Sequence, residues 1–333
     1  MKKITLAHGS GGKLMHELLD KDIIPKMGIK GVLSDSAVLD LKGSERIAFT
    51  TDSFVVSPLF FPGGNIGDLA VNGTVNDLAM VGAEPRFLTT SFIVEEGFDL
   101  DSLNIITETI SRAASLSGVE VVTGDTKVVN KGKGDGIFIN TSGIGIIGNG
   151  IDIGPSRIKA GDKIIVNSTI GRHGVSVMSE RNGLSFDPPV LSDTAPLNGL
   201  VAHMLSFTDK VHAMRDPTRG GLATTLKEIA VDANLGIIVN EKDIPLDGGV
   251  LGACELLGLD PLYVANEGLL VAFVEKNVSK SLVEHMKKHP LGRGSVMIGE
   301  VIQEKIGNVM LKTRIGGTRV LDMLSGEQLP RIC

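Results

Sequence analysis

Five aspartates stand beside small or polar residues where predicted strands end or predicted helices begin. Three of them, Asp52, Asp77 and Asp125, also adjoin apolar stretches that we expect to be buried. A buried carboxylate is costly unless it is paired or binds a metal, and hard oxygen ligands without a Cys/His cluster suit Mg²⁺ on a nucleotide's phosphates. Each aspartate alone also fits a helix cap or an Asx turn. Five such contexts in one chain nevertheless favour metal binding by Asp35, Asp52, Asp77, Asp125 and Asp216.

Two glycine-rich segments are suited to hold phosphates. The first, His8-Gly9-Ser10-Gly11-Gly12-Lys13, precedes a predicted helix, so its backbone N–H groups and the helix N-terminus can face an anion. It lacks the spacing of a Walker A loop, and taken alone it fits a flexible N-terminal turn better than a phosphate-binding loop. The second, Arg215–Gly221, combines a possible metal ligand with two arginines and paired glycines. A plain loop-to-helix entry would need neither, so this segment is the stronger indication.

The chain ends in a cysteine, Cys333, which is one of only two cysteines in 333 residues. A terminal thiol has few packing neighbours and can reach, react and move. The neighbouring α-carboxylate opposes its ionisation, so formation of a thiolate needs a cationic partner such as Arg331 or a lysine of the site. Pro330 stiffens the tail before it. A frayed end remains the simpler alternative, and Cys254, inside an apolar pattern, is expected to be a core residue.

Composition describes an ordinary soluble globular protein and excludes several function classes. The 33 basic and 39 acidic residues give a net charge of −6, which offers no field to attract nucleic acid or an anionic membrane. No signal peptide, no membrane span and no disulfide framework are visible, so we expect a cytoplasmic protein. The 42 glycines and the absence of Trp indicate backbone loops folded closely around a polar ligand.

Strand patterns rich in β-branched residues alternate with longer helical patterns, which predicts an α/β or α+β chain. A stretch dense in turn formers at Gly148–Gly161 predicts a boundary between residues 1–150 and residues 151–320, with 321–333 as a mobile tail. The predicted strands include Arg46–Thr51, Phe87–Val94, Val119–Thr123, Gly136–Ile147, Lys163–Asn167 and Gly268–Val274. The predicted helices are Lys13–Ile24, Ile66–Val81, Leu103–Ser117, Gly174–Arg181, Leu222–Ala233 and Val278–His289.

Together these elements resemble the HypE family of hydrogenase-maturation proteins, within the aminoimidazole-ribonucleotide synthetase-like (PurM-like) ATP-binding superfamily. The resemblance covers essentially the whole chain. The motifs that mark the superfamily are His8–Lys13, Thr51–Ser53, Asn72–Met80, Gly124–Lys127 and Arg215–Leu222. The ending Pro330-Arg331-Ile332-Cys333 is the narrow motif that selects HypE.

The resemblance implies a two-domain fold, with an N-terminal sheet domain that forms a barrel across a homodimer and an α/β C-terminal domain. ATP and Mg²⁺ would bind between the domains, with the five aspartates as metal ligands. The nucleotide contacts that it implies are Gly9, Gly11, Gly12, Lys13, Asn76, Gly124, Thr126, Arg215, Thr218 and Gly220.

Family members receive a carbamoyl group on the terminal cysteine from HypF and dehydrate it to a thiocyanate at the expense of ATP. The cyano group then passes to iron on the HypC–HypD complex. The residues make this chemistry plausible: Cys333 carries the group, and Lys127 with Mg²⁺ neutralises phosphate charge. Glu267, a carboxylate bounded by apolar stretches, is the candidate general base, although a salt bridge explains it as well. His8 and His173 are further candidates. Cys333 must also swing out to meet its partners.

Two other functions remain open on the sequence. One is an ATP-dependent kinase or synthetase acting on a free small molecule, like thiamine-monophosphate kinase or selenophosphate synthetase. The latter usually carries a reactive Cys or selenocysteine in its N-terminal glycine-rich region, and His8–Lys13 has neither. The other is a thiol carrier or scaffold that binds ATP only as a switch. Such a scaffold would need Cys333 but not the full set of aspartates.

Overall fold

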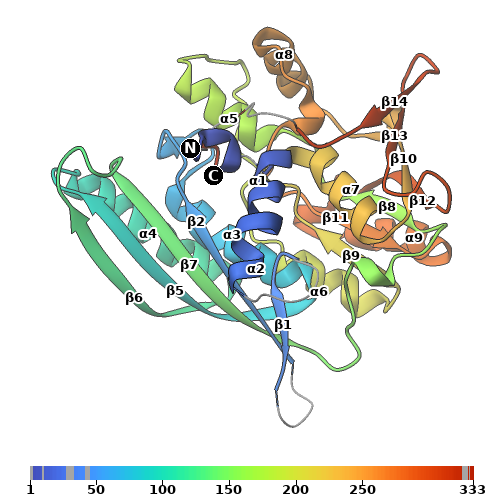
Figure 1. Cartoon of the computed structure of the whole chain (residues 1–333), viewed down its shortest axis with the longest axis horizontal. Helices are drawn as coiled ribbons and strands as arrows, with labels where there is room; N and C mark the ends of the chain where they lie inside the picture. The colour runs from blue at the N-terminus through green and yellow to red at the C-terminus, as the bar shows by residue number, and fades with distance from the viewer. Residues whose placement is uncertain (1–2, 10, 28–33, 42–45, 325–328, 330) are drawn as a thin grey trace.

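The structure is a computed structural model that describes residues 3–9, 11–27, 34–41, 46–324, 329 and 331–333. Ser10 and Pro330, which belong to two of the motifs above, lie outside the described residues. Figure 1 shows two sheet-and-helix layers side by side, with both termini on the face between them. The helices and sheets confirm the predicted mixed fold class. Within the described ranges, no helix has the length and apolar character that a membrane span requires.

The N-terminal sheet has the order β1-β2-β7-β5-β6, in which only the β5–β6 pair is parallel. Its strands are β1 (Ala37–Asp40), β2 (Arg46–Phe54), β5 (Ala83–Glu95), β6 (Glu120–Val129) and β7 (Ile137–Ile147). The short hairpin β3 (Phe60–Phe61) and β4 (Gly64–Asn65) follows β2. The predicted strand at 119–123 is longer than expected, because it continues through Gly124–Lys127. That motif therefore lies inside an exposed edge strand and not at the end of a strand.

Helices α3 (Ile66–Met80) and α4 (Leu100–Ser117) cover one face of this sheet (Figure 1). The small and apolar residues of α3 lie on every face of the helix, as expected for a buried helix. Almost every residue of α3 is buried. Asn65 and Asp68 form a capping box at its start, and Asp99 caps α4. Buried on all sides, α3 carries its polar residues to the junction of the two domains.

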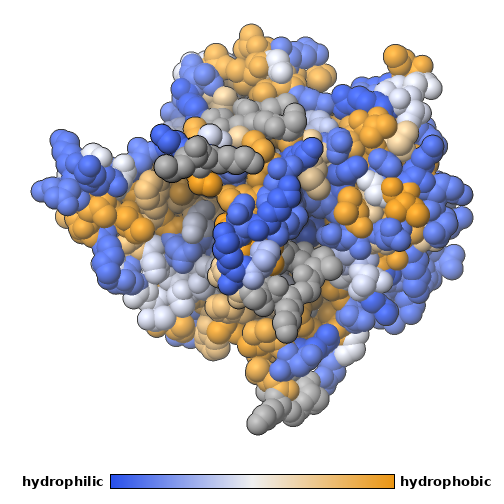
Figure 2. All heavy atoms as spheres, in the orientation of Figure 1, coloured by the Kyte–Doolittle hydropathy of each residue, from blue (hydrophilic) through white to orange (hydrophobic). Residues whose placement is uncertain are grey.

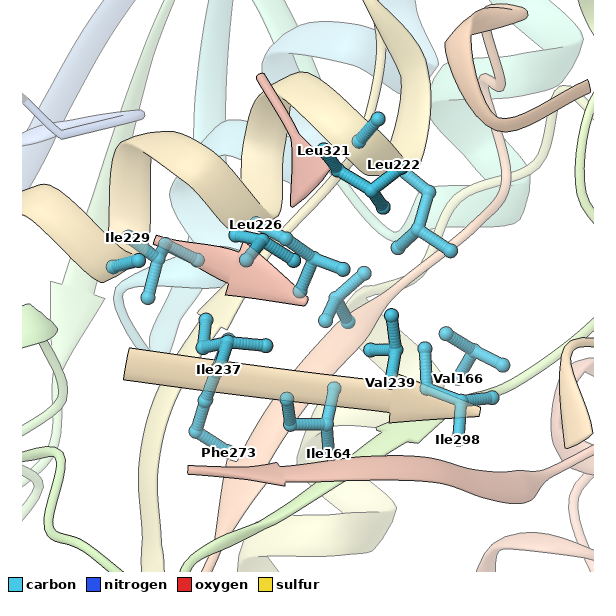
Figure 3. Packing of buried hydrophobic residues seen from close by; sticks show 14 of the residues in the cluster. Ile164, Val166, Leu222, Leu226, Ile229, Ile237, Val239, Phe273, Ile298 and Leu321 are labelled. Atoms are coloured by element: carbon cyan, nitrogen blue, oxygen red, sulfur yellow. The ribbon is translucent and has the colours of Figure 1, made fainter. Parts of the chain in front are cut away.

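The C-terminal sheet has seven strands in the order β14-β13-β10-β12-β8-β11-β9. Alternate residues of β8 enter different cores: Ile164 and Val166 pack toward α7, and Ile165 packs toward α6 and α9. Figure 3 shows the first of these cores, between α7 and the sheet. The strands are β8 (Lys163–Val166), β9 (Val211–Arg215), β10 (Gly236–Asn240), β11 (Val271–Val274), β12 (Val296–Ile302), β13 (Val309–Lys312) and β14 (Thr318–Leu321).

The predicted helices all form, with shifted ends and two additions. The C-terminal helices are α5 (Arg172–Arg181), α6 (Asn198–Phe207), α7 (Gly221–Asp232), α8 (Gly248–Leu257) and α9 (Lys276–Met286). Neither α6 nor α8 was predicted, and α8 contains three glycines that lower its intrinsic helix propensity. At the N-terminus, α1 (Lys13–Leu18), a π turn at Leu19–Ile23 and α2 (Ile24–Met27) run on continuously. This segment forms a largely hydrophilic band across the face between the two domains (Figures 1 and 2).

Candidate active site

Three of the predicted metal ligands meet although they come from three separate segments. Asp35 precedes β1, Asp77 lies on α3 and Asp216 follows β9, and one carboxylate oxygen from each lies within 4.8 Å of the others. Thr50 donates a hydrogen bond from Oγ1 to Asp77 at 2.8 Å. Oδ2 of Asp35 is buried without a hydrogen-bond partner. Such an orphaned oxygen beside two further carboxylates fits a hard divalent cation.

The pKa values of the three aspartates are all raised, which is consistent with a site that binds a cation. Burial raises the pKa of Asp216 to about 8, and the neighbouring Asp35 adds to the shift. Burial also raises the pKa of Asp35 to about 6, against the opposing charge of Arg215. The pKa of Asp77 is raised well above its usual range by burial and by the other aspartates. Without a cation, the three carboxylates therefore repel one another in a desolvated place.

A cavity of about 700 Å³ opens beside the cluster and is lined by both domains and the N-terminal segment. Asp52 lines it from β2, and its pKa is raised by burial while Arg219 opposes the shift. Thr218 lines it from the loop before α7, and Gly11 from the N-terminal segment. Four of the five predicted aspartates therefore reach one cavity, which has room for a nucleotide.

Arg215, predicted as a nucleotide contact, is committed to carboxylates in this structure. Its Nε lies 2.9 Å from Asp35, and its Nη2 lies 2.9 Å from Glu228. Glu228 in turn lies 2.9 Å from His16 of α1, and this hydrogen bond raises the pKa of His16. The guanidinium thus joins Asp35 of the aspartate cluster and His16 of the N-terminal segment, by way of Glu228, in one chain of ion pairs.

The N-terminal glycines fit closely over the cavity. Gly11 has a φ of +75°, and a Cβ there would lie 3.0 Å from Cβ of Arg219. A Cβ on Gly12 would lie 2.5 Å from the carbonyl oxygen of Leu324. The same carbonyl accepts a hydrogen bond from the backbone N–H of Lys13, and Gly9 accepts one from Nη1 of Arg219. The glycines are thus needed for close packing, while Gly9 and Lys13 are exposed and do not line the cavity.

The C-terminal tail lies against the N-terminal domain in an extended pairing. The backbone N–H of Val55 donates to Cys333, and that of Ser57 donates to Arg331, both at 3.1 Å. Arg331 also donates from Nε to the carbonyl of Val55 at 2.9 Å and forms an ion pair with Asp135. Ile332 is buried in the core that surrounds α3 and α4, so residues 331–333 are docked and not frayed.

The docked tail places Cys333 beside charged residues of the site. Burial raises the pKa of the Cys333 thiol to about 12; the charge of Arg219 opposes the shift and that of Glu267 adds to it. The pKa of Arg219 is raised mainly by the negative charge at Cys333. The terminal thiol, this arginine and Glu267 therefore share one desolvated place. Gly220, next to Arg219, has a φ of +79° and lines a small cavity against the tail rather than the large one.

Glu267 is buried, with only 4% of its surface exposed, and its Oε1 has no hydrogen-bond partner. Burial raises its pKa well above the usual range, and the charges of Asp216 and Asp52 add to the shift. Asn76, predicted to bind nucleotide, instead holds backbone: its Nδ2 donates to the carbonyls of Ala195 and Glu267, and its Oδ1 accepts from Leu197. We therefore assign Asn76 to positioning of the Glu267 segment.

The last group of predicted residues does not reach the cavity within this chain. Gly124, Asp125, Thr126 and Lys127 lie on exposed β6, where Nζ of Lys127 lies 2.5 Å from Asp125. This hydrogen-bonded pair lowers the pKa of Asp125. A Cβ on Gly124 would lie 2.1 Å from the carbonyl oxygen of Thr90, so its glycine serves the close β5–β6 pairing.

Several residues of the site were not selected from the sequence. Arg219 stands in the Arg215–Gly221 motif, where the presence of two arginines was the available signal. Glu228 lies on α7, the helix that follows this motif, and Asp193 lies in the loop between α5 and α6; neither stands in a distinguishing sequence pattern. Their roles depend on contacts with residues far away in the chain, which no local motif reveals.

Comparison with known proteins gives the family. Residues 33–147 match the AIR synthase related protein N-terminal domain, and residues 159–312 match the corresponding C-terminal domain. The chain is 48% identical to carbamoyl dehydratase HypE of Bradyrhizobium diazoefficiens, over 99% of this chain and 96% of that protein.

Two solved structures agree with this relationship. A HypE–HypF complex matches with a TM-score of 0.85 and 44% identity, covering 94% of this chain and 100% of the other. A hydrogenase maturation protein HypE in complex with ATP matches with a TM-score of 0.84 and 43% identity, covering 99% and 100%. These matches confirm the two-domain PurM-like fold and the resemblance inferred from the motifs. The chain therefore belongs to the HypE carbamoyl dehydratase family of hydrogenase-maturation proteins.

Proposed function

We propose that this chain is an ATP-dependent carbamoyl dehydratase that supplies cyanide ligands during maturation of [NiFe] hydrogenases. The observation that carries the proposal is the position of Cys333. The chain's last thiol lies beside Glu267 and Arg219, and their charges act on it together with those of Asp52 and Asp216, two of the carboxylates that line the large cavity. A free-substrate kinase would have no use for a terminal cysteine held at its own active site.

The reaction converts a carbamoyl group on the sulfur of Cys333 into a thiocyanate by removal of one water. Oxygen leaves poorly from an amide, so it is first phosphorylated and then leaves as phosphate, while the nitrogen loses two protons as C≡N forms. The carbamoyl oxygen ends in the phosphate, so ATP and the thiocarboxamide give ADP, phosphate, a proton and the thiocyanate. The sulfur–carbon bond persists throughout, so the product stays attached to the chain.

Glu267 is the proposed base for the nitrogen protons. A carboxylate whose conjugate acid has a raised pKa accepts a proton more readily, and burial keeps competing water away from Glu267. Arg219 would stabilise negative charge near the sulfur, because it already interacts with Cys333 in the docked tail. Thr218 and Gly11, at the cavity wall, are the proposed nucleotide contacts within this chain.

Mg²⁺ fits the site formed by Asp35, Asp77 and Asp216, with Asp52 nearby. The orphaned oxygen of Asp35 and the mutual repulsion of the three carboxylates both favour a bound cation. When bound, the ion would neutralise phosphate charge during transfer. A metal site next to a cavity of nucleotide size supports an enzyme over a passive thiol carrier.

Asp125 and Lys127 enter the proposal through a second copy of the chain. They lie on edge strand β6, whose apolar residues Val121, Val122 and Val128 are exposed. An exposed apolar edge strand is a template for pairing with another strand. We propose that two copies pair through these sheets, and that Lys127 and Asp125 serve the partner's cavity, together with Gly124 and Thr126.

The proposed partners follow from the resemblance and from one solved complex. A related HypE has been crystallised with HypF, which we propose as the source of the carbamoyl group here. The HypC–HypD complex is the proposed acceptor of the cyano group, and the cytoplasm is the proposed location. The tail must leave its docked position to meet both.

Intact mass spectrometry tests this function directly. The chain is treated with HypF and carbamoyl phosphate, and its mass is recorded before and after a further incubation with Mg-ATP. We expect a carbamoyl adduct that loses one water only in the second step, in wild type and in a Cys254→Ala control but not in Cys333→Ala. If Cys333→Ala forms the same adduct, or if none forms, a free-substrate ATP enzyme replaces this proposal.

A further inference from the structure

The proposed reaction requires the thiol of Cys333 and the carboxyl of Glu267 to meet, although they belong to segments far apart in the chain. Both segments are held through their backbones by one loop, which connects α5 to α6. The residues of this loop that make the contacts are neighbours, Ser192 and Asp193.

Ser192 reaches the tail through His173, a fully buried residue of α5. Nε2 of His173 lies 2.7 Å from the carbonyl oxygen of Ile332, and its Nδ1 lies 2.9 Å from Oγ of Ser192. A carbonyl oxygen only accepts hydrogen bonds, so Nε2 must carry the proton. Nδ1 then accepts from the hydroxyl of Ser192, since burial lowers the pKa of His173 to about 4 and keeps the ring neutral.

The hydroxyl of Ser192 is itself fixed by its surroundings. Its oxygen accepts a hydrogen bond from the backbone N–H of Thr194 at 3.1 Å, and the backbone N–H of Ser192 donates to Pro62 at 2.8 Å. The hydroxyl can donate one hydrogen bond, and Nδ1 of His173 accepts it. The orientation of the imidazole, and hence the place of Ile332 next to Cys333, follows from this loop.

Asp193 holds the other segment. Its Oδ1 accepts the backbone N–H of Glu267 at 3.2 Å, and its Oδ2 accepts that of Gly268 at 3.1 Å. The approach is so close that a Cβ on Gly268 would lie 1.8 Å from the carbonyl oxygen of Asp193. Both oxygens of the Asp193 carboxylate therefore bind the backbone of the Glu267–Gly268 segment, and only glycine fits at position 268.

We propose that Ser192 and Asp193 are positioning residues for the dehydration: Ser192 places the tail through His173, Asp193 places Glu267, and their adjacency fixes one against the other. This inference rests on the proposed function. Reactions between held groups are sensitive to small misplacement, and a shift of about 1 Å costs on the order of a hundredfold in rate. Because Ser192 and Asp193 are adjacent in the chain, little backbone flexibility separates the two contacts that set the distance between Cys333 and Glu267.

The base contact is tested by single-turnover dehydration of the carbamoylated chain, with intact mass as the readout. Asp193→Asn keeps the shape but turns an amide NH₂ toward one of the two N–H donors. We expect its rate to fall about 10- to 100-fold, while ATP affinity measured by calorimetry stays at the wild-type value. Asp209→Asn, an exposed aspartate before β9, is the matched control.

The tail contact is tested by alkylation of Cys333 in a Cys254→Ala background, which requires no turnover. We expect Ser192→Ala to raise the alkylation rate about tenfold, because the docked tail loses its support. Ser192→Thr, which keeps the hydroxyl, should restore slow alkylation. Asp193→Asn should leave the alkylation rate at the wild-type value. Wild-type dehydration by Asp193→Asn, or wild-type alkylation of Ser192→Ala, would overturn the inference. If wild type itself loses no water, the proposed function fails instead, and the alkylation result still decides the tail contact.

Discussion

The guanidinium of Arg215 lies 2.9 Å from the carboxylate of Asp35, and this ion pair joins the two domains at the cluster of three aspartates. The charge of Arg215 opposes the raised pKa of Asp35 and of Asp216, yet the pKa of each remains above its usual range. Burial raises the pKa of Asp77 well above its usual range, and the charges of Asp216 and Asp35 add to the shift. Burial also raises the pKa of Asp216, and there the charge of Asp35 adds to the shift. The site is therefore unfavourable without a cation and suited to a divalent one.

Asp77→Asn should separate stability from activity. The amide is isosteric, and its oxygen can still accept the hydrogen bond of Thr50, while one buried negative charge disappears. We expect the metal-free protein to melt at a higher temperature in the presence of a chelator. Dehydration should fall at least about a hundredfold, with the carbamoyl adduct accumulating on Cys333. Calorimetric melting and intact mass measure the two effects. A variant that still forms thiocyanate would favour the scaffold alternative.

His173 gives a pH dependence with a definite sign. Its pKa is about 4 in the folded protein, because of burial, and about 6.5 when unfolded. The unfolded chain thus binds more protons between these values, and the stabilising contribution of the neutral ring, complete above pH 6.5, is lost as the pH falls toward 4. We expect this residue to account for a loss of about 2 kcal/mol of unfolding free energy between pH 7 and pH 5.

Denaturant unfolding at the two pH values, in wild type and in His173→Gln, measures that loss. The comparison is needed because buried carboxylates with raised pKa contribute in the opposite direction. A difference between the two proteins that is the same at pH 5 and pH 7 would contradict the assignment of a neutral, buried imidazole.

Arg219 should control the reactivity of the terminal thiol. Its charge opposes the effect of burial on the pKa of Cys333, so Arg219→Met removes the cation that favours the thiolate. We expect the pH profile for alkylation of Cys333, recorded with Cys254→Ala, to move to higher pH. Arg293→Met, an exposed arginine, serves as the control. A profile at unchanged or lower pH would mean that Arg219 acts elsewhere.

Mixing two inactive variants tests whether Lys127 acts across a dimer. Lys127→Ala and Glu267→Gln are each expected to lose dehydration. In a mixed dimer, one of the two sites combines an intact Glu267 with an intact Lys127 from the other copy. When the two variants are mixed in equal amounts and pair at random, about half of the dimers are mixed and each has one complete site. About a quarter of all sites should therefore be active.

Turnover by the mixture, after denaturation and refolding together, gives the answer, and sedimentation reports the dimer. Mixtures of each variant with itself provide the baseline. If the mixture stays at that baseline while mixed dimers form, Lys127 does not act in the partner's site.

Patterns within single segments predicted much of the fold. The helical pattern at Ile66–Val81 and the run rich in β-branched residues at Gly136–Ile147 were both predicted, and they form α3 and β7. The helix α8 was missed because glycines weaken its local preference, and packing of Val250 and Ala253 against α5 compensates. The extent of β6 was missed because its parallel pairing with β5 has no local signal.

The sequence by itself determined which chemistry was available: aspartates suited to Mg²⁺, a carboxylate bounded by apolar residues, and a terminal thiol. Only the tertiary structure decided which groups act together. It brought Asp35, Asp77 and Asp216 into one cluster, left Lys127 on an exposed edge, and turned the amide of Asn76 toward the backbone. The physical reason is that residue type sets charge and donor capacity, whereas proximity depends on long-range packing and on the path of loops such as that of Ser192 and Asp193.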